Sequence, residues 1–287
     1  MADNILIFDK IEKGLPTLTN SQKKVADYIL KNPMQAAFST IDEIARIVKT
    51  STTTVVRFAL TLKFTGYAEL QKNLQEYLKI KSGPSVKLEM NFHNFENRNN
   101  LITDIVRQQL DNINITYANL SDNSIIQAAK KISSARHIYV FGQRSCHCVS
   151  HYLAYNINRI LGNCDFIYNG NLDIVEFLHR ISKKDVVISI SFPRYITQVV
   201  NFTALAHKRG AFIISVSDGY LSPFASISDI LLSSETLSKN FHNSMTSSML
   251  IADILIGVLT DQNRNKAKTN LKDADKILKG IQSNANL

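Results

Sequence analysis

Residues Asp185 to Ser191 read DVVISIS and are followed directly by Phe192 to Thr197, FPRYIT. The first run is short, rich in β-branched residues and apolar at successive positions, so it predicts a strand buried on both faces, as in a parallel sheet covered by helices. The second run contains a proline and an arginine and leads into a helical pattern that ends at Gly210. Strand, loop and helix in this order form half of an open α/β unit.

The same order of elements recurs on both sides of this stretch. HIYVF from His137 predicts a strand, and after a glycine-containing loop comes a helix that carries Val149, Leu153 and Ile157. Further strands are predicted at residues 166–168, 211–217 and 229–234, in FIY, AFIISVS and DILLSS. We expect about five parallel strands in one doubly wound α/β sheet. Two more amphipathic helices, between residues 249 and 281, are expected to cover the sheet or a subunit interface.

The first 81 residues carry only helical signals. Thr19 with Gln22, and Thr40 with Glu43, each have the spacing of a capping box that begins a helix. Ser51 has the character of the N-cap of a third helix. The apolar positions expected to face inward on that helix are Val55, Ala59 and Leu62.

Two short helices joined by a tight turn form a helix-turn-helix, in which the N-terminal side chains of the second helix meet base edges and phosphates of DNA. Threonine hydroxyls can bond to bases or phosphates, and an arginine can bond a phosphate or a guanine. The candidate DNA contacts are Lys49, Ser51, Thr52, Thr53, Thr54, Arg57 and Lys63. A surface helix with an ordinary polar N-terminus has the same periodicity, so spacing alone leaves both interpretations open.

A polar stretch without periodicity separates these two regions. Residues 82–98 contain the only Gly-Pro pair and many asparagines, which indicates a linker between an all-α domain, residues 1–81, and an α/β domain, residues 99–287. The chain carries 33 basic and 24 acidic residues, a net charge of +9 that favours a polyanionic partner. Because the excess is spread over both regions, charge alone does not say which of them touches nucleic acid.

The cysteine content and the N-terminus bear on the compartment. Three cysteines, an odd number in a chain of 287 residues, are expected to be thiols in a reducing environment. Asp3 and Asp9 lie where a secretory signal would be basic and then apolar, and no apolar run approaches the ~20 residues that span a bilayer. We expect a cytoplasmic protein without a membrane partner.

The loops after two of the predicted strands have the composition of an anion site. In doubly wound sheets, ligands bind at the carboxyl ends of strands, near helix N-termini that attract negative charge. Each loop carries one arginine, which can make paired bonds to a phosphate or carboxylate. The candidate ligand residues are Gly142, Gln143, Arg144, Ser145, Cys146, Ser189, Ser191, Arg194, Tyr195 and Thr197. The alternative is that both arginines are solvated or paired with nearby carboxylates.

The run from Phe38 to Leu70 closely resembles the DNA-binding domain of the RpiR family of bacterial regulators. The resemblance rests on I-x-E-I-A at residues 41–45, T-V-V-R-F at 54–58 and F-x-G-Y-x-E-L at 64–70. One departure is Lys63, where the family commonly has glycine. A lysine there is expected to lose an easy left-handed helix cap while adding a cation beside the DNA.

Residues from about 101 to 260 resemble the SIS domain, a phosphosugar-binding fold that follows the DNA-binding domain in RpiR-family proteins. The matching pieces are IYVFG at Ile138, SFPRY at Ser191 and SPFASISDILL at Ser222. The first loop has Cys146 where the family usually has serine. In the second loop the family commonly has a hydroxyl residue directly after SFPRY, whereas this chain has Ile196 at that position and Thr197 one residue later.

The resemblance implies a transcription regulator that binds double-stranded operator DNA and whose operator affinity is controlled by a phosphosugar or sugar acid. A homo-oligomer, dimer or tetramer, is expected, because two-fold-related recognition helices match a palindromic operator. The alternative is a sugar-phosphate isomerase or lyase with a helical appendage, for which Glu176, His179 and His242 are candidate bases. A third possibility is an adaptor that acts through protein contacts.

The cluster Cys146, His147, Cys148 and His151 raises the question of a metal. Its spacing does not match that of zinc sites, in which cysteines are usually two to four residues apart and four ligands converge, so we expect neither a metal nor another cofactor. Because Cys146 lies at a helix N-terminus near Arg144, a lowered thiol pKa and a redox role are also conceivable.

Overall fold

The computed structural model describes residues 7–81, 83–85, 87–88, 100–168, 174–220 and 222–284. The chain divides into two compact units, Met1–Asn94 and Phe95–Leu287. Most of the predicted linker, residues 82–98, lies outside the described residues. The domain limits 1–81 and 99–287 stay predictions.

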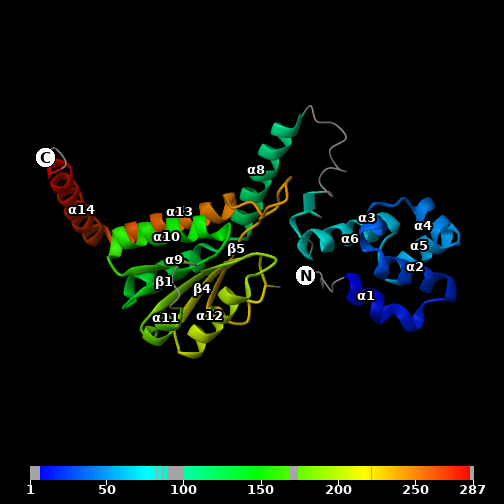
Figure 1. Cartoon of the computed structure of the whole chain (residues 1–287), viewed down its shortest axis with the longest axis horizontal. Coiled ribbons are helices and arrows are strands. Elements are labelled where there is room, and N and C mark those ends of the chain that lie inside the picture. Colours follow the sequence, from blue (N-terminus) through cyan, green and yellow to red (C-terminus); the bar gives the residue numbers. More distant parts are fainter. Residues whose placement is uncertain are drawn as a thin grey trace. The chain divides into compact units, whose positions relative to one another are not determined.

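The first unit is helical in all its described segments. Its elements are α1 (Ile7–Gly14), a 3-10 turn (Leu15–Thr17), α2 (Asn20–Lys31), α3 (Pro33–Phe38), α4 (Ile41–Ile47), α5 (Thr52–Thr61) and α6 (Tyr67–Lys81) (Figure 1). The sequence predicted α2, α4 and α5, whereas it did not foresee α6 or the short helices α1 and α3. Short helices of this kind are held by packing rather than by propensity, which makes them hard to see in a sequence.

All three predicted helix starts are confirmed. In α2 the backbone N–H of Thr19 donates to Gln22 Oε1 at 2.9 Å, and the Gln22 N–H donates to Thr19 Oγ1 at 3.4 Å. Thr40 and Glu43 make the same reciprocal pair at the start of α4, at 2.7 and 3.2 Å. Ser51 Oγ accepts the N–H of Thr54 at 3.2 Å, which caps α5. Val55, Ala59 and Leu62 are buried, as their spacing predicted.

The second unit alternates helices and strands. Its helices are α8 (Leu101–Asn119), α9 (Asp122–Ser134), α10 (Cys146–Leu161), α11 (Ile174–Arg180), α12 (Thr197–Lys208), α13 (Thr246–Gln262) and α14 (Arg264–Asn284), and its strands are β1 (Ile138–Phe141), β2 (Cys164–Ile167), β3 (Val186–Ile190), β4 (Phe212–Ser217) and β5 (Ile230–Ser233). The five strands form one parallel sheet in the order β2-β1-β3-β4-β5. The predicted fold class is confirmed.

Helices cover both faces of this sheet (Figure 1). Side chains from α9, α10 and α13 pack with Ile138, Val140 and Ile188 in one core, whereas those from α11 and α12 pack with Tyr139, Phe141 and neighbouring residues in the other. Burial on both faces explains why the strands read as continuous apolar runs. None of the helices in the described segments is both long and apolar enough to cross a membrane.

The strand order creates a topological switch between β1 and β3. After β1 the chain adds β2 on one side, and it then returns to place β3 on the other side of β1. In sheets of this kind the loops that leave the two central strands diverge, and the crevice between them is where ligands bind. The loops at this crevice are Gly142–Ser145, after β1, and Ser191–Ile196, after β3.

Candidate functional site

The N-terminus of α5 presents a polar surface in the first unit. Thr53 and Arg57, one turn apart, are exposed, and Thr52 is half-buried. The hydroxyl of Thr54 lies 3.0 Å from Ser51 Oγ, so these two side chains are engaged in the cap. Thr53 and Arg57 are therefore better placed than Ser51 and Thr54 to meet a base edge or a phosphate.

A lysine with left-handed backbone ends each of the two helices α4 and α5. Lys49 has φ 53° and Lys63 has φ 63°. After α4 the N–H of Thr50 donates to the carbonyl of Ala45 at 2.8 Å, and after α5 the N–H of Phe64 donates to that of Ala59 at 3.0 Å. These are the bonds of a Schellman cap, which usually places glycine at the left-handed position.

The expectation for Lys63 is therefore corrected in one respect. The left-handed cap is kept, although a lysine occupies it at a cost of about 1–2 kcal/mol relative to a right-handed conformation. Both side chains are exposed, so Lys49 places a cation in the turn between α4 and α5, and Lys63 places one just after α5. Non-glycine residues in strained backbone conformations are more frequent at functional sites than elsewhere.

The loop after β1 begins at a glycine with no room for a side chain. A Cβ at Gly142 would lie 2.1 Å from Ser150 Oγ and 3.1 Å from the carbonyl oxygen of Ile190. Both the β1 loop and β3 thus approach the first turns of α10 closely. Gly142 is required by this packing, which holds the two candidate loops side by side.

Arg144 and Arg194 occupy equivalent places in the two loops. Both are exposed and both have left-handed backbone, with φ of 53° and 67°. Together with Lys49 and Lys63, they are the only non-glycine residues of the described segments with positive φ. Neither arginine takes part in an ion pair within the described part of the chain, which removes the alternative that they neutralise nearby carboxylates there.

The helices that follow these loops have no side-chain cap. Ser145 and Ile196, the N-cap residues of α10 and α12, accept no backbone N–H through a side chain, whereas α2, α4, α5 and α9 are capped in this way. The N-terminus of a helix carries about half a unit of positive charge. Two such ends beside Arg144 and Arg194 make the carboxyl edge of the sheet attractive to an anion.

Side-chain hydrogen bonds join the first loop to α12 and the second loop to the residue that follows β4. Gln143 is buried, and its Nε2 donates to Gln198 Oε1 at 2.7 Å. The hydroxyl of Tyr195 donates to Asp218 Oδ1 at 2.6 Å, and burial, together with this bond, raises the pKa of Tyr195. Ser191 is buried, while Ser145 and Thr197 are exposed. Gln198 and Asp218 were not predicted, although Asp218 follows a strand directly, which was the available signal.

Ser189 differs from its expected role. Its side chain lies in the core beneath α12, where its Oγ is 2.6 Å from Thr203 Oγ1, and it is completely buried. Residues on one strand alternate between faces, so a serine within β3 points into a helix-covered face and not out of the strand's end. The structure therefore gives Ser189 a partner within the protein in place of a ligand.

Cys146 also differs from expectation. Its side chain is buried. Burial is the main cause, and the charge of the nearby Cys148 a smaller one, that raises the pKa of its thiol to about 12. The alternative of a lowered thiol pKa is thus not supported, because desolvation of the thiolate outweighs the hydrogen bonds that would lower the pKa. Cys148 is exposed and Cys164 is buried, and all three cysteines are free.

The histidines of the same helix form an exposed stack. The rings of His147 and His151 are parallel within 4° at a centroid distance of 6.0 Å, and both pack edge-on against Phe166. Within the described residues no group of three or more histidine, cysteine, aspartate or glutamate side chains is arranged to hold a metal ion.

Two of the three candidate bases share a helix, and the third lies in a different segment. Glu176 and His179 are exposed on α11, His179 at its last turn, and His242 is exposed in the segment before α13 with its ring against Phe241. Glu235, which the sequence analysis missed, follows β5 at the carboxyl edge. Burial, and then the charge of Asp218, raises its pKa. Its position two residues after a strand was the signal that could have found it.

Comparison with known proteins identifies both units. The family description "Helix-turn-helix domain, rpiR family" matches residues 5–81, and "SIS domain" matches residues 131–258. An HTH-type transcriptional regulator of Caldanaerobacter subterraneus is 24% identical over 91% of this chain and 93% of its own. HexR of Escherichia coli K12, also an HTH-type transcriptional regulator, is 25% identical over 74% of this chain and 72% of its own.

Two solved structures share the fold. The sugar isomerase domain of an RpiR transcription factor from Sphaerobacter thermophilus matches with a TM-score of 0.60 and 22% identity, over 62% of this chain and 99% of that one. The NanR protein of Vibrio vulnificus, in a complex with ManNAc-6P, matches with a TM-score of 0.59 and 20% identity, over 96% and 98% of the two chains. The chain has the architecture of a helix-turn-helix regulator with a SIS domain. It belongs to the RpiR family of transcriptional regulators.

Proposed function

We propose that this chain regulates transcription by binding double-stranded operator DNA through α5, and that a phosphosugar or related sugar acid bound at the carboxyl edge of the sheet controls that binding. The observation that carries the proposal is the pair of arginines with left-handed backbone, Arg144 and Arg194, which have no ion pair among the described residues and lie beside two helix N-termini without a side-chain cap. Each guanidinium can bind a phosphate or carboxylate through two parallel hydrogen bonds.

The coupling between the two ligands is thermodynamic. If the effector changes the affinity for DNA by some factor, DNA must change the affinity for the effector by the same factor. The sign of the effect is open, so the same arrangement serves a repressor or an activator. A regulator of this kind works where the chromosome is, and we place it in the cytoplasm.

Gel-shift titration of the chain's own upstream region tests the proposal. Arg57→Ala should weaken this complex by about 1–3 kcal/mol while effector binding stays intact. Arg194→Ala should abolish the response of the complex to effector while binding to DNA without effector is retained. Thermal-shift screening of phosphosugars and sugar acids identifies the effector, and ManNAc-6P is a natural first compound because the NanR neighbour binds it. An Arg194→Ala variant that responds fully would place the anion site elsewhere.

Self-association forms part of the proposal. Ile277, Leu278 and Ile281 lie within one turn of each other on α14 and are each more than half exposed, and α8 exposes Ile102, Val106 and Leu110 in the same way. Apolar stripes of this kind usually mark an interface. Light scattering of the purified chain gives its oligomeric state, and a monomer at micromolar concentration would contradict this part of the proposal.

A second candidate function is sugar-phosphate isomerisation or lysis. The observation that favours it is Glu235, a half-buried carboxyl with a raised pKa at the edge of the proposed effector site, since a general acid-base needs a pKa near the working pH. Incubation of the chain with phosphosugars separates the two functions. Efficient turnover that Glu235→Gln abolishes would support the enzyme, and binding without turnover supports the regulator.

A further inference from the structure

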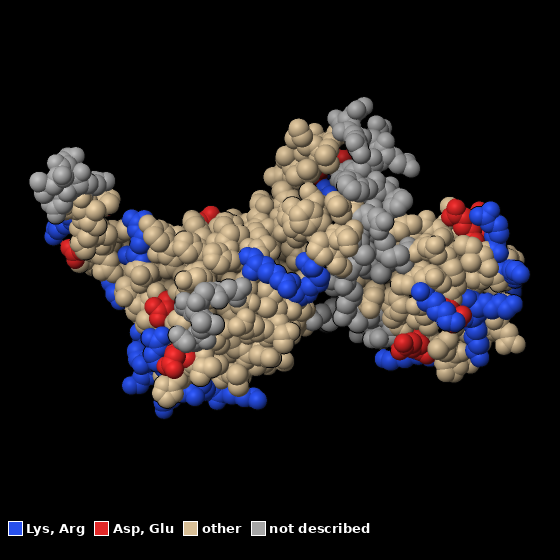
Figure 2. All heavy atoms as spheres, in the orientation of Figure 1, with Lys and Arg blue, Asp and Glu red and all other residues tan. Residues whose placement is uncertain are grey.

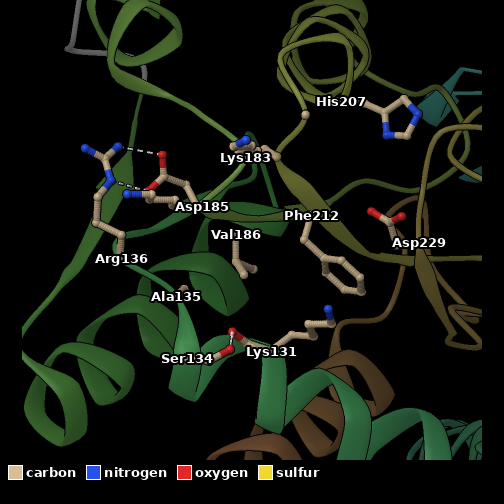
Figure 3. A pocket seen from close by; sticks show the side chains of 13 residues that line it. Lys131, Ser134, Ala135, Arg136, Lys183, Asp185, Val186, His207, Phe212 and Asp229 are labelled. Carbon is tan, nitrogen blue, oxygen red and sulfur yellow. Dashed lines mark hydrogen bonds and ion pairs between the residues drawn. The ribbon is translucent and has the colours of Figure 1, made fainter.

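A cavity of about 460 Å³ opens at the edge of the sheet opposite to the arginine loops (Figure 3). It lies where the residues that precede β1, β3, β4 and β5 meet the last turns of α9 and α12. A second cavity, of about 400 Å³, adjoins it at Arg136 and is lined by His137, Tyr139, His179 and Arg180. The two cavities thus occupy the amino edge of the sheet, whereas the proposed effector site lies at the carboxyl edge.

This amino edge is strongly basic. The lysine and arginine residues that line the two cavities are Lys131, Arg136, Arg180, Lys183 and Lys184, and the histidines of the lining are His137, His179 and His207. The carboxylates in the lining are Asp185 and Asp229. Figure 2 shows lysine and arginine side chains gathered over the end of the sheet and helices to which these segments belong.

The arginines of this edge are bound to other groups of the protein. Arg136 donates to both carboxylate oxygens of Asp185, at 2.8 and 2.6 Å, and to the carbonyl of Arg180 at 2.9 Å. Arg209, just after α12, donates to the carbonyls of Ile181 and His179 at 3.1 and 2.9 Å. The guanidinium of Arg180 lies 5.0 Å from the centre of the Phe177 ring. The hydrogen bonds from Arg136 and Arg209 thus satisfy backbone carbonyl groups at the C-terminal end of α11.

The lysines are different. Lys183 and Lys184 are exposed in the turn before β3, and within the described part of the chain neither side chain has a hydrogen bond or an ion pair. The ammonium of Lys131 lies 4.7 Å from the centre of the Phe212 ring, on the opposite side of the cavity from Lys183 (Figure 3). The cavity therefore has cations on facing walls that no described side chain neutralises.

Helix dipoles do not account for this excess. The C-termini of α9, α11 and α12 meet the amino edge, and each is equivalent to about half a unit of negative charge. Arg136, Arg180 and Arg209 already supply a full positive charge apiece at these ends. Lys131, Lys183 and Lys184 leave the edge positive even after Asp185 and Asp229 are counted against them.

We infer that the amino edge of the SIS sheet contacts the phosphate backbone of DNA, as a second, sequence-independent contact beyond the one made by α5. Exposed ammonium groups on flexible stems suit contact with many phosphates in turn, whereas recognition of one small anion needs donors held in fixed positions. The inference rests on the proposed function, in that α5 brings the chain to DNA. It adds a role for the second unit that effector binding does not require.

The contact has a measurable signature in the salt dependence of binding. Each neutralised phosphate contributes about 0.9 to the slope of the logarithm of affinity against the logarithm of salt concentration. Removing Lys183 and Lys184 should lower that slope by about 2. Between 50 and 200 mM salt, the affinity of the variant should then fall on the order of tenfold less than that of the natural chain.

The experiment is fluorescence anisotropy with the full chain and a duplex of about 30 base pairs, on the order of 100 Å long, over a series of salt concentrations. The variants are Lys183→Ala/Lys184→Ala, the matched pair Lys266→Ala/Lys268→Ala on α14, whose lysines are also exposed, and Lys183→Arg/Lys184→Arg. Two duplexes are used, the chain's own upstream region and one of arbitrary sequence. Melting temperature and light scattering verify that fold and oligomeric state are unchanged.

The expected result is a lower slope on both duplexes for Lys183→Ala/Lys184→Ala, with natural slopes for the α14 pair and for the arginine pair. An unchanged slope for the first variant overturns the inference. Inorganic pyrophosphate that binds the natural chain but not this variant, together with an unchanged slope, would overturn it in favour of a small-anion site. Arg57→Ala distinguishes the two proposals, because it should reduce preference for the upstream duplex and leave the contribution of Lys183 and Lys184 in place.

Discussion

Replacement of Gly142 by alanine tests the packing that holds the two arginine loops together. The added Cβ would lie 2.1 Å from Ser150 Oγ, 3.1 Å from the carbonyl oxygen of Ile190 and 3.2 Å from that of Cys146. The serine hydroxyl can rotate away, but the two carbonyl oxygens belong to β3 and to the first turn of α10 and cannot. Overpacking of this kind typically costs about 1–3 kcal/mol, and we expect a value of about 2 kcal/mol.

A second substitution separates the sources of this cost. Ser150 is fully buried, and its Oγ has no hydrogen-bond partner among the described groups. Ser150→Ala alone should therefore be neutral or stabilise the unit by up to about 1 kcal/mol. In the double variant the shortest contact disappears while both carbonyl contacts remain, so a coupling energy of about 1 kcal/mol between the two positions is expected.

Thermal and urea unfolding of the full chain measure these effects. For a unit of this size, a loss of about 2 kcal/mol lowers the melting temperature by about 4–8 °C. The matched control is Gly257→Ala in α13, where, apart from the two neighbouring residues and the nearby backbone of the helix itself, no described atom lies within 4 Å of the added Cβ, and a helical alanine should stabilise by about 0.5–1 kcal/mol. If Gly142→Ala has the same melting temperature as the natural chain, or if the double variant shows no coupling energy, then these close contacts do not require glycine at position 142 and the reasoning fails.

Three other predictions concern single side chains. Lys63→Gly should stabilise the first unit by about 0.5–1 kcal/mol in urea unfolding, because glycine relieves the left-handed strain, while gel shifts show weaker DNA binding from the lost cation. Burial opposes ionisation of Asp185, but hydrogen bonds from Arg136 outweigh it and lower the pKa. Its contribution to stability is thus present above its ordinary pKa and lost as the pH falls through the lowered value. Asp185→Asn should cost about 2–3 kcal/mol at pH 7 and flatten this acid limb in pH-dependent unfolding. Iodoacetamide should modify Cys148 before Cys146, whose buried thiol has a pKa of about 12, and peptide mass spectrometry that finds Cys146 labelled first would contradict this.

Local signals in the sequence were sufficient for most elements. The capping boxes at Thr19 and Thr40 and the N-cap at Ser51 act within four residues, so their spacing alone marks where three helices begin. The apolar runs of β1, β3 and β4 are buried on both faces and could be read directly. By contrast, α1 and α3 are one or two turns long and depend on the core that they cover, which no short window of sequence contains.

Side-chain environments were the least predictable part of the site. Ser189 lies near the end of β3 and Cys146 begins α10, and both were predicted to contact the ligand, yet the structure buries both side chains. Whether a hydroxyl meets a ligand or Thr203 depends on which face of β3 it occupies and on what α12 places opposite. The raised thiol pKa of Cys146 likewise comes from desolvation by neighbours distant in sequence.

The sequence by itself determined the fold class, because helix caps and strand periodicity lie within short runs of consecutive residues, and its resemblance to the RpiR family indicated the class of protein. The tertiary structure decided where the two arginine-bearing loops meet. Only the order β2-β1-β3-β4-β5 brings the ends of β1 and β3 together at a switch point, and strand order is fixed by long-range packing that leaves no mark within either loop. It also decided that lysines from separate turns converge at the opposite edge, since the residues that precede parallel strands all gather there.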